Sequence, residues 1–375
     1  MTVVQPDGTP VYAYTPPGSF YENTPNFVQA LPTHQTFFVT CPNGDEEWGG
    51  HTGGTVETFH YSLNPLTVSH RTTLTTGNRP FHIYPTPDEQ ICVTNDGDGT
   101  ISLIDPTTLE VTTFPGGHDH GTVGFVSTEE GYDLFVTRFH GAESGGVDII
   151  DGRTRLIRTT LSNLLPQPHS MVYSSVTQRM YIACAGGIEV IGTAGAEKDL
   201  HLDTLPTTEG RMTPLLRVSP DGRYLIGNCH WDGEPGSYFY AIDLLTEERK
   251  TMASVSCKSF AYSPDGNWIV AGDYNKPGDQ EIQRVHIINS NPTSEHYMTV
   301  VKEISLSIPS QVGAFAQAFS PDSRTAYLGL TQTDQIMVID VSTLTATTFG
   351  CEPAPVFLNV LPLSETTPVH HWIQY

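Results

Sequence analysis

The stretch Thr213-Pro-Leu-Leu-Arg-Val-Ser-Pro-Asp-Gly-Arg-Tyr-Leu-Ile-Gly-Asn-Cys229 decides the fold of this chain. Two runs of strand-forming residues flank a Ser-Pro-Asp-Gly turn, so the stretch predicts a strand, a tight turn and a second strand. The same pattern recurs at Phe260–Gly272 and Phe315–Gly329. Looser copies lie at Phe27–Thr33, Phe81–Asp88 and Ser170–Ser175. The chain is therefore organised around a repeat.

Each copy is followed by a third predicted strand that often ends in aspartate, as in Ile101-Ser-Leu-Ile-Asp105 and Ile336-Met-Val-Ile-Asp340. This aspartate starts a turn by bonding its own backbone, and a short threonine-rich fourth strand follows. A four-stranded unit that repeats every roughly 40 to 50 residues is typical of a β-propeller. The alternative is a β-sandwich with similar turns, but the third strand recurs in nearly the same form too often to favour it.

We therefore predict an all-β fold in which residues 1–375 form a single β-propeller domain. Full four-stranded blades span about 27–350 and number seven. Residues 1–26, which include a predicted hairpin around Pro6-Asp7-Gly8, and residues 351–375 are closing segments. Together they have about the length of one blade. They either complete an eighth blade or decorate a ring of seven.

Composition narrows the possible partners. The formal net charge is −23, which disfavours nucleic acid and anionic membrane surfaces because both require a basic face. No apolar run is long enough to span a bilayer. The first residues lack the basic and apolar segments of a signal peptide. We expect a cytoplasmic monomer with a small-molecule substrate; a secreted protein with a trimmed signal is the alternative.

The six cysteines do not suggest a disulfide framework. None forms a Cys-x-x-Cys pair, and four of them lie in or at the end of predicted second strands of different blades. We expect them to be small buried apolar residues.

At the level of the repeat, the chain resembles the YVTN/lactonase-type propellers, which include carboxymuconate cycloisomerase-like enzymes. The residues that carry this resemblance are the Ser-Pro-Asp-Gly turns, the segment Asn95–Asp105 and the Arg79-Pro80-Phe81-His82 stretch. The resemblance implies the propeller architecture for most of the chain. It implies function only broadly, as an enzyme of small-molecule metabolism, because no catalytic motif of a named family maps onto this chain.

Polar residues gather on one predicted face of the ring. In a propeller, the loops between second and third strands and the loops leading into first strands open on the same side. For general acid/base chemistry in a pocket there, the candidate proton carriers are His82, His120 and His169, and the candidate anion clamps are Arg79, Arg138, Arg211 and Lys258. Candidate pocket residues on the same face are Trp48, His51, Phe139, His140, His230, Trp231 and Tyr274.

The same histidines allow a second interpretation. His118 and His120 form a His-x-His pair, and His82 and His169 are candidate further ligands for Zn, Cu or Fe. The acid/base interpretation requires no cofactor. The metal-binding interpretation requires a divalent metal instead. A third interpretation is a non-catalytic interaction scaffold.

We favour an enzyme acting on a small, largely apolar metabolite that carries a carbonyl or carboxylate group. The fitting reaction types are cycloisomerisation or cyclisation, elimination by a lyase, and lactone hydrolysis. Gly49–Gly54 lacks the lysine and the strand-to-helix context of a phosphate-binding loop, and Asn95–Gly99 lacks the glutamate of a calcium loop. Neither motif therefore points to another function.

Overall fold

The chain is described here from a computed structural model. The structure describes residues 2–4, 10–13, 27–42, 53–117, 121–139, 145–207, 215–229, 238–252, 255, 257–273, 284–306, 317–330, 333 and 335–350.

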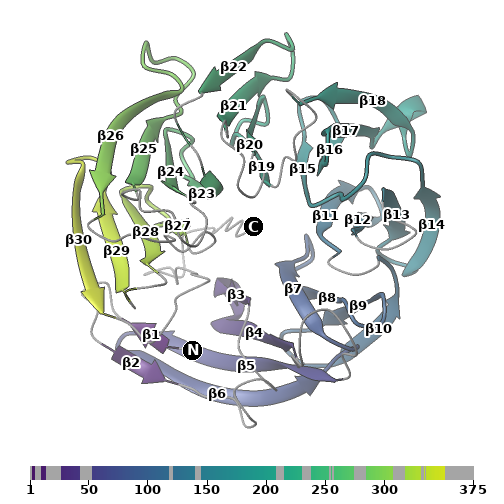
Figure 1. The fold of residues 1–375 in the computed structure, drawn as a ribbon. Coiled ribbons are helices and arrows are strands. Elements are labelled where there is room, and N and C mark those ends of the chain that lie inside the picture. The colour runs from purple at the N-terminus through teal and green to yellow at the C-terminus, as the bar shows by residue number, and fades with distance from the viewer. Residues whose placement is uncertain are drawn as a thin grey trace.

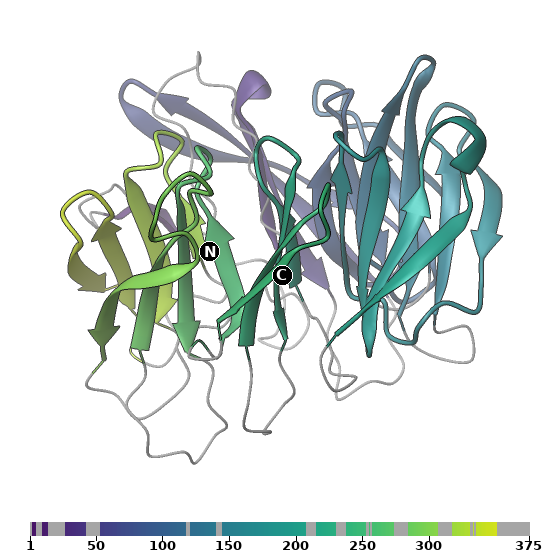
Figure 2. The same cartoon turned by 90° about the horizontal axis from the view of Figure 1, so that it is seen from above.

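The described residues form seven four-stranded antiparallel sheets arranged as the blades of a ring (Figure 1). Within each blade, the four consecutive strands are ordered from the central channel to the rim. Each strand lies roughly parallel to the ring axis (Figure 2). Apart from the short 3₁₀ helices η1 (Pro32–His34) and η2 (Gly195–Glu197), the described part of the chain has no helix. No helix in it is long and apolar enough to cross a membrane. The predicted β-propeller is confirmed.

The first four blades follow one another along the chain. Blade 1 consists of β3 (Val28–Leu31), β4 (Thr36–Pro42), β5 (Gly54–Leu63) and β6 (Leu66–Thr75). Blade 2 consists of β7 (Pro80–Pro85), β8 (Ile91–Asn95), β9 (Thr100–Ile104) and β10 (Val111–Pro115). Blade 3 consists of β11 (Val123–Thr128), β12 (Gly131–Arg138), β13 (Gly146–Asp151) and β14 (Leu156–Leu161). Blade 4 consists of β15 (Ser170–Ser174), β16 (Arg179–Cys184), β17 (Gly187–Gly192) and β18 (His201–Pro206).

The remaining three blades complete the ring. Blade 5 consists of β19 (Leu215–Val218), β20 (Tyr224–Cys229), β21 (Tyr238–Asp243) and β22 (Arg249–Met252). Blade 6 consists of β23 (Cys257–Tyr262), β24 (Trp268–Asp273), β25 (Arg284–Asn289) and β26 (Thr299–Ser305). Blade 7 consists of β27 (Gln317–Phe319), β28 (Thr325–Leu330), β29 (Gln335–Asp340) and β30 (Thr345–Gly350).

The predicted N-terminal hairpin is present. β1 (Thr2–Val4) and β2 (Pro10–Ala13) pair with each other as a separate two-stranded sheet, and β2 contacts β6. Val3 and Tyr12 pack against the apolar core of blade 1. The described residues thus form seven four-stranded blades and this hairpin, and the alternative of an eighth blade depends on the C-terminal segment. Residues 351–375 lie outside the described residues.

The repeated turns have the chemistry that the sequence predicts. In the Ser-Pro-Asp-Gly turn of blade 5, the hydroxyl of Ser219 donates to Asp221, and the backbone N–H of Gly222 donates to the carbonyl of Ser219. At the end of a third strand, Asp105 Oδ1 accepts backbone N–H bonds of 2.8 Å from Thr107 and Thr108. These local bonds fix where each strand ends and the next begins.

The core lies between the blades. Val123 at the start of blade 3, for example, packs in one cluster with Tyr84 and Ile101 of blade 2. Each fully buried aliphatic or aromatic side chain of this kind contributes roughly 1.5–3 kcal/mol to stability. Because both faces of a sheet are covered by neighbours, adjacent blades stabilise one another.

The described cysteines belong to this core. Cys41, Cys92, Cys184, Cys229 and Cys257 are all buried and unbonded to one another, which confirms the expectation for these five. Burial raises the pKa of the Cys41 thiol to about 12, and the pKa of the Cys184 thiol is also well above its usual value. A raised pKa and burial both keep the reactive thiolate scarce.

We therefore expect these five thiols to resist iodoacetamide in the folded protein at about pH 8 and to react fully after unfolding in guanidinium. Peptide mass spectrometry after each treatment measures the labelling of every cysteine separately. Stoichiometric labelling of Cys41 or Cys184 in the folded protein would contradict the burial described here.

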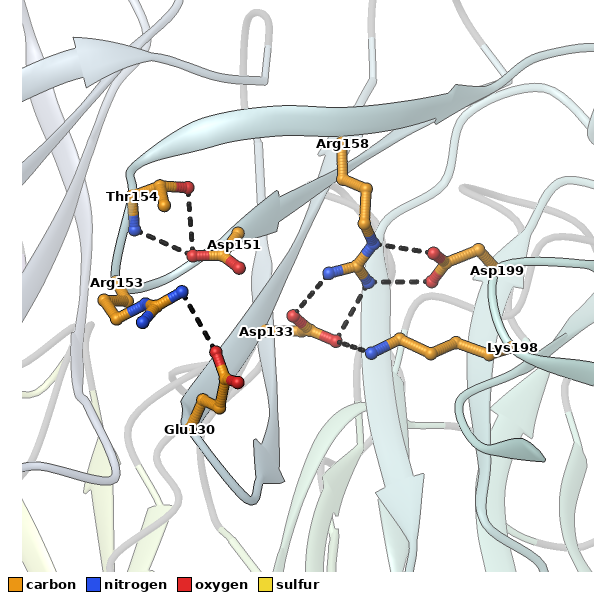
Figure 3. A network of polar contacts seen from close by, with 8 residues as sticks. All are labelled: Glu130, Asp133, Asp151, Arg153, Thr154, Arg158, Lys198 and Asp199. Atoms are coloured by element: carbon orange, nitrogen blue, oxygen red, sulfur yellow. Dashed lines mark hydrogen bonds and ion pairs between the residues drawn. The ribbon is translucent and has the colours of Figure 1, made fainter.

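An ion-pair network ties the rim of blade 3 to blade 4 (Figure 3). Arg158 on β14 donates to both oxygens of Asp133 on β12, at 2.7 and 2.9 Å, and also to both oxygens of Asp199, which follows η2 in blade 4. Lys198 lies 3.0 Å from Asp133. Burial alone would raise the pKa of Asp133, but hydrogen bonds from Arg158 and Lys198 outweigh it and lower that pKa.

Because the folded-state pKa of Asp133 is lowered, its contribution to stability is complete above the unfolded pKa of about 4 and is lost as pH falls through the folded value. We expect Asp133→Asn to lower the free energy of unfolding by about 1.5–3 kcal/mol at neutral pH and by less near pH 3. Urea unfolding at both pH values measures this. Glu130→Gln is the control, since Glu130 pairs with Arg153 on an exposed surface; an equal loss in both variants would contradict the prediction.

Candidate functional site

His82 is a predicted site residue in a strand segment that two neighbouring blades contact. It lies on β7, the innermost strand of blade 2, where the strand carries one extra residue: Phe81 and His82 together lie opposite Thr94 of β8. Such a β-bulge bends a strand and changes the direction of a side chain, and bulges are over-represented beside active sites. His82 is only 4% exposed.

The bulge is held from both neighbouring blades. The Thr40 hydroxyl of blade 1 donates to the carbonyl of Phe81 at 2.8 Å. On the other side, His82 Nδ1 lies 3.0 Å from the carbonyl oxygen of Gly121, which leads into blade 3. A carbonyl only accepts, so Nδ1 must carry the proton; in the neutral ring, Nε2 is then the nitrogen that accepts a proton. The ring's orientation and tautomer are thus set by the fold.

The surroundings of His82 are mostly aromatic. Its ring lies 5.0 Å from that of Phe27 and 4.9 Å from that of Phe81, both edge-to-face, and 6.0 Å from that of Tyr84. The Arg79 guanidinium lies 5.5 Å from the centre of the Phe81 ring. This combination of apolar rings, one imidazole and one guanidinium is suited to a largely apolar ligand with an anionic group.

Two of the three predicted catalytic histidines, His82 and His169, follow prolines, and the residues before these prolines share a backbone conformation. Arg79 before Pro80 and Gln167 before Pro168 both have a φ of 55°. The histidines that follow differ, however. His82 lies within the bulge of β7, whereas His169 directly precedes β15, donates its backbone N–H to Ala183 and packs edge-to-face on Phe139. The two are therefore not at equivalent positions, because only His82 has the extra residue of a bulge beside it.

Arg138, a predicted clamp, makes a buried ion pair. Its Nε and Nη2 donate to the two oxygens of Asp148 at 3.1 and 2.9 Å, and the Asp148 side chain is fully buried. Thr160 and the backbone N–H of Gly117 also donate to this carboxylate. The Arg138 guanidinium is therefore already neutralised by Asp148.

The Arg138 pair belongs to a structural feature that recurs on third strands. Glu57 and Glu189 occupy the position of Asp148 in blades 1 and 4, since each of the three acids pairs across the sheet with a threonine of the fourth strand. His70 Nε2 lies 2.8 Å from Glu57, and His201 Nε2 lies 2.7 Å from Glu189. In each of these blades a basic side chain thus covers a buried acid, which indicates a structural role for all three bases.

The other predicted site residues lie outside the described residues: Trp48, His51, His118, His120, His140, Arg211, His230, Trp231 and Tyr274. Lys258 lies on β23, and its side chain is likewise not described. Its backbone is part of a second bulge, since residues 258 and 259 together lie opposite Gly272. Blades 2 and 6 thus both have bulges near the start of their innermost strands.

Metal binding stays a prediction. In the described part of the chain, no three His, Cys, Asp or Glu side chains are grouped closely enough to hold a metal ion. The His118–His120 pair on which the metal hypothesis rests lies outside that part. The monomeric state, the cytoplasmic location and the scaffold alternative also stay predictions.

Tyr84 and Arg217 are large polar residues of the innermost strands that were not among the predicted site residues. Arg217 on β19 is buried, donates to the carbonyl of Leu216 and lies 5.9 Å from the centre of the Phe260 ring. Burial lowers the pKa of Arg217 to about 9, and the Tyr84 phenol opposes this shift. Tyr84 and Arg217 occupy equivalent positions in blades 2 and 5. Gln29 occupies the same position in blade 1, and the other four blades have a small or apolar residue there, so a large polar residue at this repeat position was the signal in the sequence.

Comparison with known proteins supports the fold at low sequence identity. No protein family model and no curated protein sequence matches the chain. Among solved structures, the dihydro-heme d1 dehydrogenase NirN in complex with DHE aligns with a TM-score of 0.66 at 14% identity, over 95% of this chain and 71% of that one. Apo AztD from Citrobacter koseri aligns with a TM-score of 0.61 at 13% identity, over 93% and 91%.

A third similar structure is a putative 6-phosphogluconolactonase from Bacteroides uniformis, with a TM-score of 0.57 at 15% identity over 80% of this chain and 93% of that one. These similarities show the propeller fold alone. They agree with the predicted resemblance to lactonase-type propellers at the level of architecture.

Proposed function

We propose that this chain is an enzyme that acts on a small, largely apolar organic metabolite with a carbonyl or carboxylate group. The reaction is of the cycloisomerase or cyclase, lyase or lactonase type, and His82 is the proton carrier. The observation that carries the proposal is the bulge of β7, where the carbonyl of Gly121 accepts a hydrogen bond from Nδ1 of His82 and Nε2 is the basic nitrogen.

The neighbouring residues support this choice of substrate. Phe27, Phe81 and Tyr84 supply an apolar surface around the imidazole, and Arg79 supplies a positive charge. A proton carrier fixed beside such a surface has what ring opening, ring closure and elimination share, namely proton transfer next to a carbonyl or carboxylate. Two of the similar propellers are described as a dehydrogenase and a putative lactonase, so related architectures include enzymes.

The proposal is tested with one probe for each reaction type: δ-valerolactone for hydrolysis, cis,cis-muconate for cyclisation and malate for elimination. Proton NMR follows conversion of each probe by the full chain, and calorimetry measures its binding. Metal analysis of the same preparation separates acid/base chemistry from a metal centre. We expect at least one probe to bind and react without a stoichiometric metal. Failure of all three to bind would overturn the proposal.

A further inference from the structure

Gln317 is a buried polar side chain on β27, the innermost strand of blade 7. It is 6% exposed, and within the described part of the chain neither its Oε1 nor its Nε2 has a hydrogen-bond partner. A buried amide without partners is destabilising and rare in native proteins, and a ligand that pairs with it is one physical explanation for its presence.

The repeat shows that the fold itself does not require a polar residue there. Gln317 lies in the cross-sheet row that continues through Leu328 to Met337. In blades 1 and 3 the same row ends at Glu57 and Asp148 on the third strand. The first-strand residues of this row in the other six blades are all apolar: Val28, Ile83, Val123, Met171, Leu216 and Phe260.

The row also gives the direction of the Gln317 side chain. Side chains of one cross-sheet row share a face of the sheet, and Leu328 and Met337 pack against Ala261 and Val270 of blade 6. Gln317 is therefore at the channel end of the interface between blades 6 and 7. It faces the blade whose innermost strand, β23, has the second bulge.

We propose that Gln317 binds the substrate or product of this channel, and that the ligand is a 2-hydroxy carboxylate. A planar amide presents a donor and an acceptor side by side. A 2-hydroxy acid presents the complementary pair on adjacent carbons: a carboxylate oxygen that accepts from Nε2 and a hydroxyl that donates to Oε1. This inference rests on the proposed function, because it places a ligand with a carboxylate in the channel.

The first measurement needs no ligand. We expect Gln317→Leu to raise the melting temperature by about 2 °C or more, because leucine fills an apolar row and removes two unpaired polar atoms. The matched control is Leu216→Gln, which places an amide at the equivalent position of blade 5 and should lower the melting temperature. A lower melting temperature for Gln317→Leu would overturn the inference, since the amide would then be stabilised by the protein itself.

The second measurement compares malate with succinate, which differ only by the 2-hydroxyl. We expect the wild-type chain to bind malate at least 10-fold more tightly in calorimetric titrations, and Gln317→Leu to lose this preference. No preference in the wild type, or a preference that survives in Gln317→Leu, overturns the inference.

The outcomes separate this inference from the proposed function. If the wild type binds malate, His82→Asn impairs its conversion and Gln317→Leu leaves the preference unchanged, the proposed function stands and the role of Gln317 is wrong. If neither acid binds the wild type, the role of Gln317 is wrong whichever other probe reacts.

Discussion

Replacing His82 by asparagine should lower turnover of the reactive probe by about 100-fold or more while the protein stays folded. The asparagine amide can still donate to the carbonyl of Gly121, as Nδ1 of His82 does at 3.0 Å. The variant therefore keeps the bond that orients the residue but loses the nitrogen that exchanges a proton. NMR assays at equal enzyme concentration measure turnover, and thermal unfolding shows whether the fold is intact.

His296→Asn is the matched control, because His296 is exposed at the rim and its change should leave turnover at the wild-type value. If His82→Asn does not fold, His82→Gln is the second variant, since its longer side chain places an amide nearer to the position of Nε2. Normal turnover in a folded His82 variant would show that the imidazole is structural.

Arg138→Met should lower the free energy of unfolding by about 3–5 kcal/mol, because it leaves a fully buried carboxylate without its cation. Thr160 and the N–H of Gly117 still donate to Asp148, but neither supplies a compensating charge. Urea unfolding at neutral pH measures the loss. Methionine keeps much of the length and apolar stem of arginine, so the effect reports mainly on the charge and its hydrogen bonds.

Arg153→Met is the control for this variant. Arg153 also pairs with a carboxylate, that of Glu130 at 3.0 Å, but both side chains are mostly exposed, so the loss should be at most about 1 kcal/mol. If Arg138→Met unfolds no more easily than Arg153→Met but loses turnover, Arg138 is a substrate clamp, as the sequence first suggested.

The sequence by itself determined the repeat and the class of fold. The Ser-Pro-Asp-Gly turns and the aspartates that end third strands specify their own conformation through bonds between residues two or three apart, such as Asp105 to Thr107. Local chemistry of this kind does not depend on neighbouring blades. The start of each blade could therefore be predicted to within about two residues, as at Phe81 for β7 and Thr213 for β19.

His82 could be selected as a candidate site residue from the sequence, because it lies two residues after Pro80 at the start of a predicted innermost strand. The bulge beside His82 could not be predicted from the sequence. Whether one or two residues of β7 oppose Thr94 depends on the partner strand and on bonds from blades 1 and 3. Such a one-residue change in register alters the face on which a side chain lies.

Tertiary structure alone decided which charges and polar groups are already bound. Arg138 and Asp148 lie on neighbouring strands of blade 3, but the sequence does not show that this carboxylate is fully buried or that the backbone N–H of Gly117, at the end of blade 2, also donates to it. The place of the N-terminal hairpin had the same origin: the sequence predicts the hairpin, but only the structure shows that it contacts β6 of blade 1. Long-range packing sets these features, because their energies depend on how closely separate sheets approach.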